Sequence, residues 1–324
     1  MSRRRVAAAA LIATLAASAP PVVLATAGGA GAPGAEPAGG FAVGVQVLPY
    51  VDRSRLERPR RGKPGPRALT VILRYPATGA AREGDVPGAP PARGTSPYPL
   101  IVFAHGFDVT AATYARLLRA WTRAGFVVAA PVFPLESSAA PGGPDESDLV
   151  NEPADISFVI SRLLAAAAAP SGTLSGLIDP ARIAVAGQSD GGIAALAAAY
   201  GRRTRDPRIK AAVVLSGAEA SGFGGYGFRA GEPPLLAVQG TADTTNLPRN
   251  TDEYFRAASR PKYLLRLLGA GHLPPYTTEA AQLALVERAT IAFLDGYLDG
   301  TPGVPARIAA AAAGPRLARL TAEP

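Results

Sequence analysis

Serine, histidine and aspartate residues lie along this chain in an order that suits nucleophilic catalysis. Ser189 is the central residue of Gly187-Gln188-Ser189-Asp190-Gly191, a G-x-S-x-G pentapeptide. A short apolar strand is expected before it and an alanine-rich helix after it. Such an elbow needs glycine on both sides of the nucleophile, because the turn is sharp and the packing close. The alternative interpretation is an ordinary glycine-rich turn between a strand and a helix.

A serine needs a base to take its proton, and the base is usually histidine. The chain has two histidines, His105 and His272. His105 directly follows an apolar strand, a place where histidine more often braces the loop that binds the oxyanion. His272 follows the last predicted parallel strand, where the chain order Ser, Asp/Glu, His puts the base of an α/β hydrolase. We therefore expect His272 to be the base, with a surface loop histidine as the alternative.

The acid that orients the base should follow the preceding strand. Asp243 comes shortly after the apolar run 235–238 and suits this role, which is to hold the imidazole tautomer and stabilise the imidazolium. Asp252 and Glu253 are rivals, but they fall in a helix predicted to begin near Leu247.

Two backbone N–H groups are expected to form the oxyanion hole. One belongs to Asp190, the residue after the serine, and the other to Phe107 in the loop after the strand at 100–104. A carboxylate beside developing negative charge is unfavourable, so we expect the Asp190 side chain to point away from the hole.

The elements that must position these residues alternate between strands and helices. Apolar periodicity predicts strands at 41–48, 69–75, 100–104, 126–130, 182–186, 209–215, 235–238 and 263–268. It predicts helices at 111–124, 153–164, 191–200 and 279–298. This alternation indicates a doubly wound α/β fold with a mostly parallel sheet, whose chemistry lies at the carboxyl ends of the strands.

The segment 216–234 is the only spare length between Ser189 and Asp243, and it is too short for a helical cap domain. We expect an open, lidless cleft. Phe223, Tyr226 and Phe228 are candidate apolar contacts for a substrate, unless this segment is merely a flexible surface loop.

Composition excludes several other classes of protein. The chain of 324 residues is 48% hydrophobic and 18% charged, which excludes wholesale disorder. It has no cysteine, so disulfides, thiolate metal sites and a cysteine nucleophile are ruled out. Two histidines make a histidine-rich metal centre improbable, and no metal or cofactor is expected.

Basic residues concentrate in one stretch, 53–67, which contains six arginines and one lysine. Nucleic-acid binding would favour interleaved aromatic residues, and this run is interrupted by proline and glycine instead. We expect a solvated loop between two strands, with weak attraction to an anionic surface as the alternative and no nucleic-acid partner.

The N-terminus has the pattern of a secretory signal peptide over residues 1–27. Three arginines precede an apolar stretch, and the A-x-A exits 17–19 and 25–27 place the cleavage site between Ala19 and Ala27. An uncleaved anchor is the alternative, and the sequence leaves the Sec and Tat routes open. The predicted mature protein is secreted, with no membrane span.

The remaining domain boundaries follow from composition. Residues 28–40 are expected to be a flexible linker, residues 41–299 a catalytic domain, and residues 300–324 a loosely ordered tail rich in Ala, Pro and Arg.

Together these motifs make the chain resemble the α/β-hydrolase superfamily over about residues 41 to 299. It is most similar to the branch of dienelactone hydrolases, platelet-activating-factor acetylhydrolases and secreted bacterial polyester hydrolases. The segments that carry the resemblance, besides the contexts of Asp243 and His272, are 73–77, 99–107, 126–131, 153–159 and 187–192. The chain departs from the family at Gln188, where histidine is common, and at Asp190, where an apolar residue is usual. It also lacks the disulfide that many polyester hydrolases carry.

These observations favour a secreted serine hydrolase of carboxylic esters that works through an acyl-enzyme on a small-molecule, lipid or polymer ester. A secreted acyltransferase with the same triad is one alternative, and a catalytically silent binding protein on the same scaffold is another. The sequence does not choose the ester, the acyl chain length or the oligomeric state.

Overall fold

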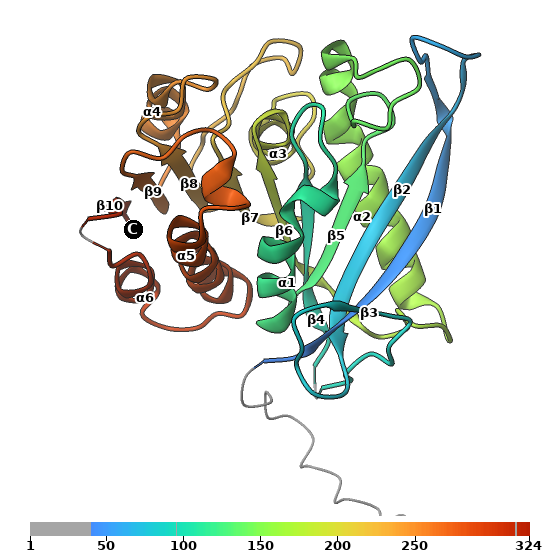
Figure 1. Ribbon diagram of the computed structural model, residues 1–324, viewed down its shortest axis with the longest axis horizontal. Coiled ribbons are helices and arrows are strands. Elements are labelled where there is room, and N and C mark those ends of the chain that lie inside the picture. Colours follow the sequence, from blue (N-terminus) through green and yellow to red (C-terminus); the bar gives the residue numbers. More distant parts are fainter. Residues whose placement is uncertain (1–39, 95, 315) are drawn as a thin grey trace, which may run out of the picture. The chain divides into compact units, whose positions relative to one another are not determined.

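The computed structural model describes residues 40–94, 96–314 and 316–324, which build a ten-stranded sheet with helices on both faces (Figure 1). The strand order is β10-β9-β8-β7-β6-β4-β5-β2-β1-β3. Strands β4 to β9 run parallel to their neighbours, whereas β2 and β10 join at the two sides in antiparallel pairing. The expected signal peptide, and all of the linker except residue 40, lie outside the described residues.

The strands are β1 (Ala42–Glu57), β2 (Gly65–Ala77), β3 (Asp85–Pro87), β4 (Tyr98–Ala104), β5 (Val127–Val132), β6 (Ile178–Gln188), β7 (Ile209–Leu215), β8 (Leu235–Gly240), β9 (Lys262–Leu267) and β10 (Ala318–Glu323). The helices are α1 (Ala115–Arg123), α2 (Glu152–Ala168), α3 (Asp190–Tyr200), α4 (Pro248–Ala257), α5 (Ala280–Leu298) and α6 (Val304–Ala311). Short 3-10 turns occur at η1 (Ala111–Tyr114), η2 (Glu146–Asn151) and η3 (Pro274–Tyr276).

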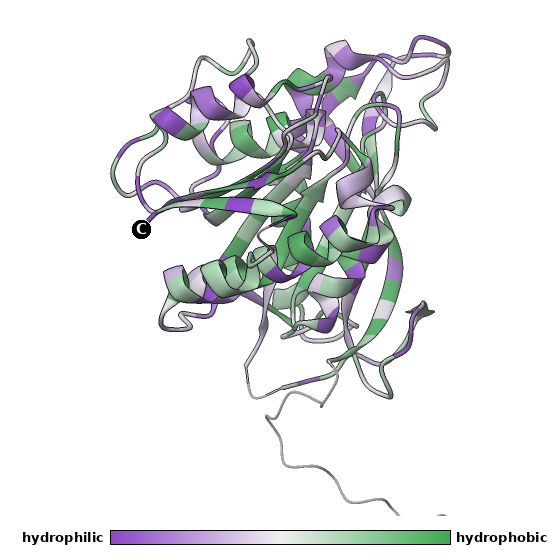
Figure 2. Ribbon diagram, turned by 60° about the vertical axis from the view of Figure 1, so that its left-hand side comes forward, coloured by the Kyte–Doolittle hydropathy of each residue, from purple (hydrophilic) through white to green (hydrophobic). Residues whose placement is uncertain are grey.

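The sheet has one hydrophobic core on each face, which confirms the doubly wound α/β prediction. Helices α2, α3 and α4 pack on one face and α1, α5 and α6 on the other. The central parallel strands are apolar over their buried stretches, 99–104, 183–187, 211–215 and 235–238, because both faces of the sheet are covered there (Figure 2). The chain returns to the amino edge after each parallel strand, through a helix in every case except the connection from β7 to β8. The loops after β4, β6, β8 and β9 therefore meet at the carboxyl edge.

The solvated loop expected from the sequence covers only part of the basic stretch. Residues 58–64 form an exposed loop that carries four of the seven cations, whereas Arg53, Arg55 and Arg67 lie in the two strands of a long hairpin. Strands β1 and β2 pair from Ala42–Ala77 to Glu57–Gly65, with a bulge between Asp52 and Leu56. Arg67 is 1% exposed and forms paired hydrogen bonds with the carboxylates of Asp148 and Asp155. Burial of this guanidinium is possible because two carboxylates neutralise it, and sequence composition does not reveal such partners.

The C-terminal segment is also ordered, contrary to the expected loose tail. Helix α6 packs Ile308 into the core beneath α5, and β10 pairs antiparallel with β9 from Ala318–Leu267 to Glu323–Lys262. The sheet therefore extends almost to the end of the chain, well past residue 299. The alanine-rich composition hid α6 because only one of its residues is fully buried.

The segment 216–234 between β7 and β8 contains neither a helix nor a strand. Its only ladder contact is an isolated bridge between Gly201 and Tyr226. The prediction of a hydrolase without a large cap therefore agrees with the chain as described. Among the described residues, no helix combines the length and apolarity needed to cross a membrane.

Candidate active site

Ser189 lies on a strained turn between β6 and α3. Its φ and ψ are 57° and −122°, a region that non-glycine residues rarely adopt. Both flanking glycines are required by close packing: a Cβ on Gly187 would lie 2.0 Å from the carbonyl oxygen of Gly191, and one on Gly191 would lie 2.2 Å from that of Ala104. The pentapeptide thus forms the sharp elbow predicted from its glycines.

The structure brings Ser189, His272 and Asp243 together from three separate loops. His272 Nε2 lies 2.8 Å from Ser189 Oγ, and His272 Nδ1 lies 2.8 Å from Asp243 Oδ2. The carboxylate can only accept, so Nδ1 carries the proton and Nε2 is free to accept the serine proton. This arrangement suits a serine nucleophile, a histidine base and an orienting acid.

Asp243 is held in place by several donors in the turn after β8. Its Oδ1 accepts from the backbone N–H groups of Thr245 and Asn246, and its Oδ2 also accepts from Gln239 Nε2. Burial would raise the pKa of Asp243, but the hydrogen bonds from His272 and its other neighbours hold it below its usual value. Asp243 is therefore ionised and faces the imidazole.

The rival acids lie elsewhere. Asp252 forms an ion pair with Arg266, and Glu253 is exposed on α4. Neither forms a hydrogen bond with His272, whose Nδ1 is already bonded to Asp243.

The backbone N–H groups of Phe107 and Asp190 come from the loop after β4 and the first residue of α3. No described residue accepts a hydrogen bond from either group. An N–H at a helix N-terminus favours negative charge. The side chain of Phe107 is 38% exposed, so the loop presents an apolar ring to solvent beside these donors.

His105 is fully buried and holds the backbone of this loop. Its Nε2 accepts from the N–H of Phe133 at 3.0 Å, so its Nδ1 carries the proton and donates to the carbonyl oxygen of Gly106 at 2.8 Å. Burial lowers the pKa of His105 to about 4. A neutral, doubly hydrogen-bonded imidazole fits the bracing role expected from the sequence.

Gln188 and Tyr114 form a polar bridge that sequence reasoning missed. The Tyr114 hydroxyl donates to Gln188 Oε1 at 2.7 Å and accepts from the N–H of Gly106 at 3.3 Å. Gln188 Nε2 donates to the carbonyl oxygen of His272 at 3.1 Å. The sequence showed Gln188 as a departure from the family and put Tyr114 in the expected helix 111–124, but it gave no sign that the two side chains meet.

A buried acid cluster, Glu136, Glu152 and Asp190, lies behind the serine elbow. Glu136 and Glu152 are 0% exposed, and none of their four carboxyl oxygens has a hydrogen-bond partner among the described residues. Burial and mutual repulsion raise the pKa of Glu152 well above its usual value, and burial raises that of Glu136 to about 8. Both shifts favour the protonated, neutral form of these carboxyls near neutral pH.

Asp190 is the third member of this cluster. It is 7% exposed, and its Oδ2 has no hydrogen-bond donor among the described residues. Burial and the charge of Glu146 raise its pKa to about 6, although His272 acts in the opposite direction. Acidic residues are frequent in the loop after β5, but the sequence did not show that Glu136 and Glu152 are buried, because burial depends on tertiary packing.

The expected substrate contacts are not where the sequence put them. Phe223 is fully buried, Tyr226 is 9% exposed and stacks on Phe228, and Phe228 packs on Tyr200. Tyr200 is the last of the 11 residues of α3, and Ser189 directly precedes the helix, so about 16 Å of helix separates them. These aromatic residues therefore close the core at the far end of α3.

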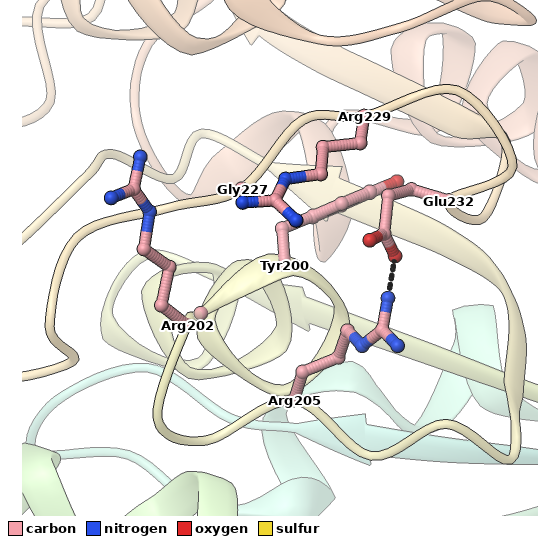
Figure 3. A pocket seen from close by; sticks show the side chains of 7 residues that line it. Tyr200, Arg202, Arg205, Gly227, Arg229 and Glu232 are labelled. Carbon is pink, nitrogen blue, oxygen red and sulfur yellow. Dashed lines mark hydrogen bonds and ion pairs between the residues drawn. The ribbon is translucent and has the colours of Figure 1, made fainter.

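A cavity of about 330 Å³ opens beside them (Figure 3). Its lining includes Tyr200, three arginines and Glu232, which forms an ion pair with Arg205. It lies at the amino edge of the sheet, away from Ser189. Among the described residues, no cluster of three or more histidine or carboxylate side chains has the geometry of a metal site.

Comparison with known proteins points to one superfamily. Residues 88–238 match the family model of chlorophyllase, just under half of the chain. The structure is similar to that of a ferulic acid esterase from Streptomyces cinnamoneus, with a TM-score of 0.63 and 24% identity over 84% of this chain and 94% of the other. No curated protein matches the sequence. The chain therefore has the α/β-hydrolase fold and is related to the α/β-hydrolase superfamily.

Proposed function

We propose that this protein hydrolyses carboxylic esters with Ser189 as nucleophile. The observation that carries the proposal is the chain of two 2.8 Å hydrogen bonds from Ser189 through His272 to Asp243, with Ser189 on a strained elbow. Strain is maintained where surrounding structure over-determines it, typically at functional sites. The similarity to a protein named an esterase supports the same chemistry.

In the proposed mechanism His272 removes the proton from Ser189 as its oxygen attacks the ester carbonyl. The N–H groups of Phe107 and Asp190 stabilise the oxyanion, and Asp243 stabilises the imidazolium that forms. His272 then protonates the leaving alcohol. Water, activated by the same histidine, releases the acid from the acyl-enzyme.

The test is hydrolysis of p-nitrophenyl esters from acetate to palmitate, with methyl ferulate added because a ferulic acid esterase shares the fold. Ser189→Ala should lower kcat by at least about 10⁴-fold. Ser138→Ala, the same change at an exposed serine in a nearby loop, is the matched control. A fluorophosphonate should label Ser189 in the wild type and no residue in Ser189→Ala.

Two outcomes would contradict ester hydrolysis. If a folded wild type neither turns over an ester nor reacts with the fluorophosphonate, a silent binding protein is favoured. If the acyl-enzyme forms but releases acyl product only to an added alcohol, the protein is an acyltransferase. Product analysis with and without acceptor alcohol separates hydrolysis from transfer.

We also propose that the protein is secreted after cleavage of a signal peptide over residues 1–27. The three arginines, the short apolar stretch and the A-x-A exits support this proposal. N-terminal sequencing of protein from the culture medium should find a first residue at 20 or 28. Recovery of the intact N-terminus from the membrane fraction alone would contradict cleavage.

A further inference from the structure

The tip of the β1–β2 hairpin projects past the carboxyl edge of the sheet. Thr70 of β2 pairs with Val132, the last residue of β5, so residues 65–69 extend beyond the end of that strand. Their partners in β1 extend with them (Figure 1). Ser189 and Phe107 lie in loops at this same edge, so the hairpin stands beside the candidate active site.

Tertiary contacts divide the basic stretch of the hairpin into two groups. Arg55 and Arg67 point inward and bind the buried carboxylates of Asp148 and Asp155. The other cations are exposed, namely Arg53, Arg58, Arg60, Arg61 and Lys63. The inward pairs hold the hairpin to the body of the protein, and the outward group leaves positive charge at its tip.

The acids near the tip only partly offset this charge. Glu57 is half-buried and accepts from the N–H of Ala68, and Asp145 forms an ion pair with Arg60. Glu146 is exposed on the neighbouring turn and contributes to the raised pKa of Asp190. The five exposed cations therefore exceed the acids that face them.

Exposed apolar side chains gather at the same edge. Among the described residues five large hydrophobic side chains are exposed, and all five belong to the hairpin or to the loops after β4 and β5. Val47 lies in the part of β1 that is level with β5, and the other four lie nearer the carboxyl edge. Their exposed fractions are 47% for Val51, 57% for Leu56, 38% for Phe107 and 49% for Val150. Cations beside exposed apolar groups are typical of surfaces that bind anionic lipid.

One loop connects the hairpin tip to the candidate oxyanion hole. The N–H of Arg61 donates to Pro141 in the loop after β5, and Glu136 of that loop accepts from the N–H of Asp108, next to Phe107. The hairpin tip and Phe107 are thus parts of one hydrogen-bonded surface. A membrane that contacts the tip would face the entrance to Ser189.

We propose that this edge binds an anionic lipid surface and presents the active site to esters at the lipid–water interface. This proposal rests on the proposed ester hydrolysis, and it adds that the ester is met at a lipid surface. The cations attract anionic headgroups, while Leu56 and Val51 enter the interface. A soluble polyanion would use the cations but not the exposed apolar groups, which is why lipid is the favoured partner.

Sedimentation with vesicles tests this docking. The full chain should bind vesicles of phosphatidylcholine with about 30 mol % phosphatidylglycerol, and bind pure phosphatidylcholine much less. Raising NaCl from about 0.1 to about 0.5 M should weaken binding, because salt screens exposed charges. The variant Arg58→Gln/Arg60→Gln/Arg61→Gln/Lys63→Gln should lower the partition coefficient at least about 10-fold.

A matched control removes the same charge at the opposite edge. Arg202→Gln/Arg203→Gln/Arg205→Gln/Arg229→Gln neutralises the three arginines that line the cavity at the end of α3 (Figure 3) and the exposed Arg203 next to them in the chain. This variant should retain most of the vesicle binding. All variants carry the same N-terminal residues, so any contribution of that segment cancels, and circular dichroism checks that each is folded.

Three results would overturn the proposal. These are absence of binding to anionic vesicles, an equal loss in the control variant, and a Leu56→Ser variant that binds vesicles as well as the wild type. The last result would favour a soluble polyanion, which binding to dextran sulfate would identify. Vesicle binding is also measured with Ser189→Ala, because binding does not need the nucleophile. A wild type that binds vesicles but hydrolyses no ester would contradict only the proposed function.

Discussion

The side-chain amide of Gln188 donates to the backbone carbonyl oxygen of His272 at 3.1 Å, directly beside the hydrogen bond between His272 and Ser189. The oxygen of the same amide accepts a hydrogen bond from the Tyr114 hydroxyl, which in turn accepts a hydrogen bond from the N–H of Gly106. A single buried side chain therefore ties the loop of the proposed base to the loop of the proposed oxyanion hole. Loops that must hold atoms to within a fraction of an ångström need such cross-links.

Gln188→Ala should lower kcat for p-nitrophenyl acetate about 10-fold with little change in KM, because the loss of one hydrogen bond misplaces the reacting groups rather than the substrate. Tyr114→Phe should act through the same bridge, so the double variant should be no worse than Gln188→Ala. Gln46→Ala, which removes a distant hydrogen bond to Thr173, is the control. Additive losses would show that Gln188 and Tyr114 act independently.

Asp243→Asn should lower kcat by about 10⁴-fold, since an amide no longer favours the imidazole tautomer with its proton on Nδ1. Steady-state kinetics on p-nitrophenyl acetate measure the loss. Asp252→Asn, in the rival acid on α4, should retain wild-type rates because its carboxylate pairs with Arg266 instead. Comparable losses in both variants would contradict the assignment of Asp243.

Glu136→Gln should make stability less dependent on pH. The pKa of Glu136 is raised from 4.5 to about 8 by burial, so the folded state binds more protons than the unfolded state between these values. The contribution of Glu136 to the free energy of unfolding should be fully present below about pH 4.5 and should be lost as pH rises towards 8. Near pH 9 the variant should melt about 2–4 °C above the wild type.

Calorimetry at pH 5, 7 and 9 measures this effect, with Glu253→Gln at an exposed carboxylate as control. Some pH dependence should remain in Glu136→Gln, because Asp190 also has a raised pKa of about 6. A variant with the same fall in melting temperature as the wild type would show that Glu136 is ionised at neutral pH.

Gly191→Ala should destabilise the fold, because its Cβ would meet the carbonyl oxygen of Ala104 at 2.2 Å and backbone cannot move aside cheaply. We expect a melting temperature at least about 5 °C lower, or an insoluble protein. Gly271→Ala lies beside His272, but no atom lies within 4 Å of its added Cβ. This control should melt within about 2 °C of the wild type, and equal effects at the two glycines would contradict the packing argument.

Arg67→Met should lower the free energy of unfolding by about 3–5 kcal/mol, because it leaves the buried carboxylates of Asp148 and Asp155 without their shared partner. Urea denaturation measures the free energy of unfolding. Arg58→Met removes an exposed charge of the same hairpin and should change it by less than about 0.5 kcal/mol. Similar values for the two variants would contradict the role of Arg67 as the buried partner of these carboxylates.

The sequence by itself determined the fold class and the residues of the candidate triad. Apolar runs that alternate with helical periodicity allow few topologies, since crossover connections between parallel strands are right-handed. Within such a topology, Ser189, Asp243 and His272 each follow a strand at the same edge, and local sequence is enough to show this. The glycines around Ser189 were equally readable, because a sharp turn restricts which residue types it accepts.

Only the tertiary structure decided which side chains are buried and with which partners. Arg58 and Arg67 look alike in the sequence, yet the first is exposed and the second lies between two carboxylates more than eighty residues away. Phe223 looked available to a substrate but closes the core at the end of α3. Composition and periodicity report local preference, whereas burial and pairing depend on contacts between distant segments, which form only when the sheet assembles.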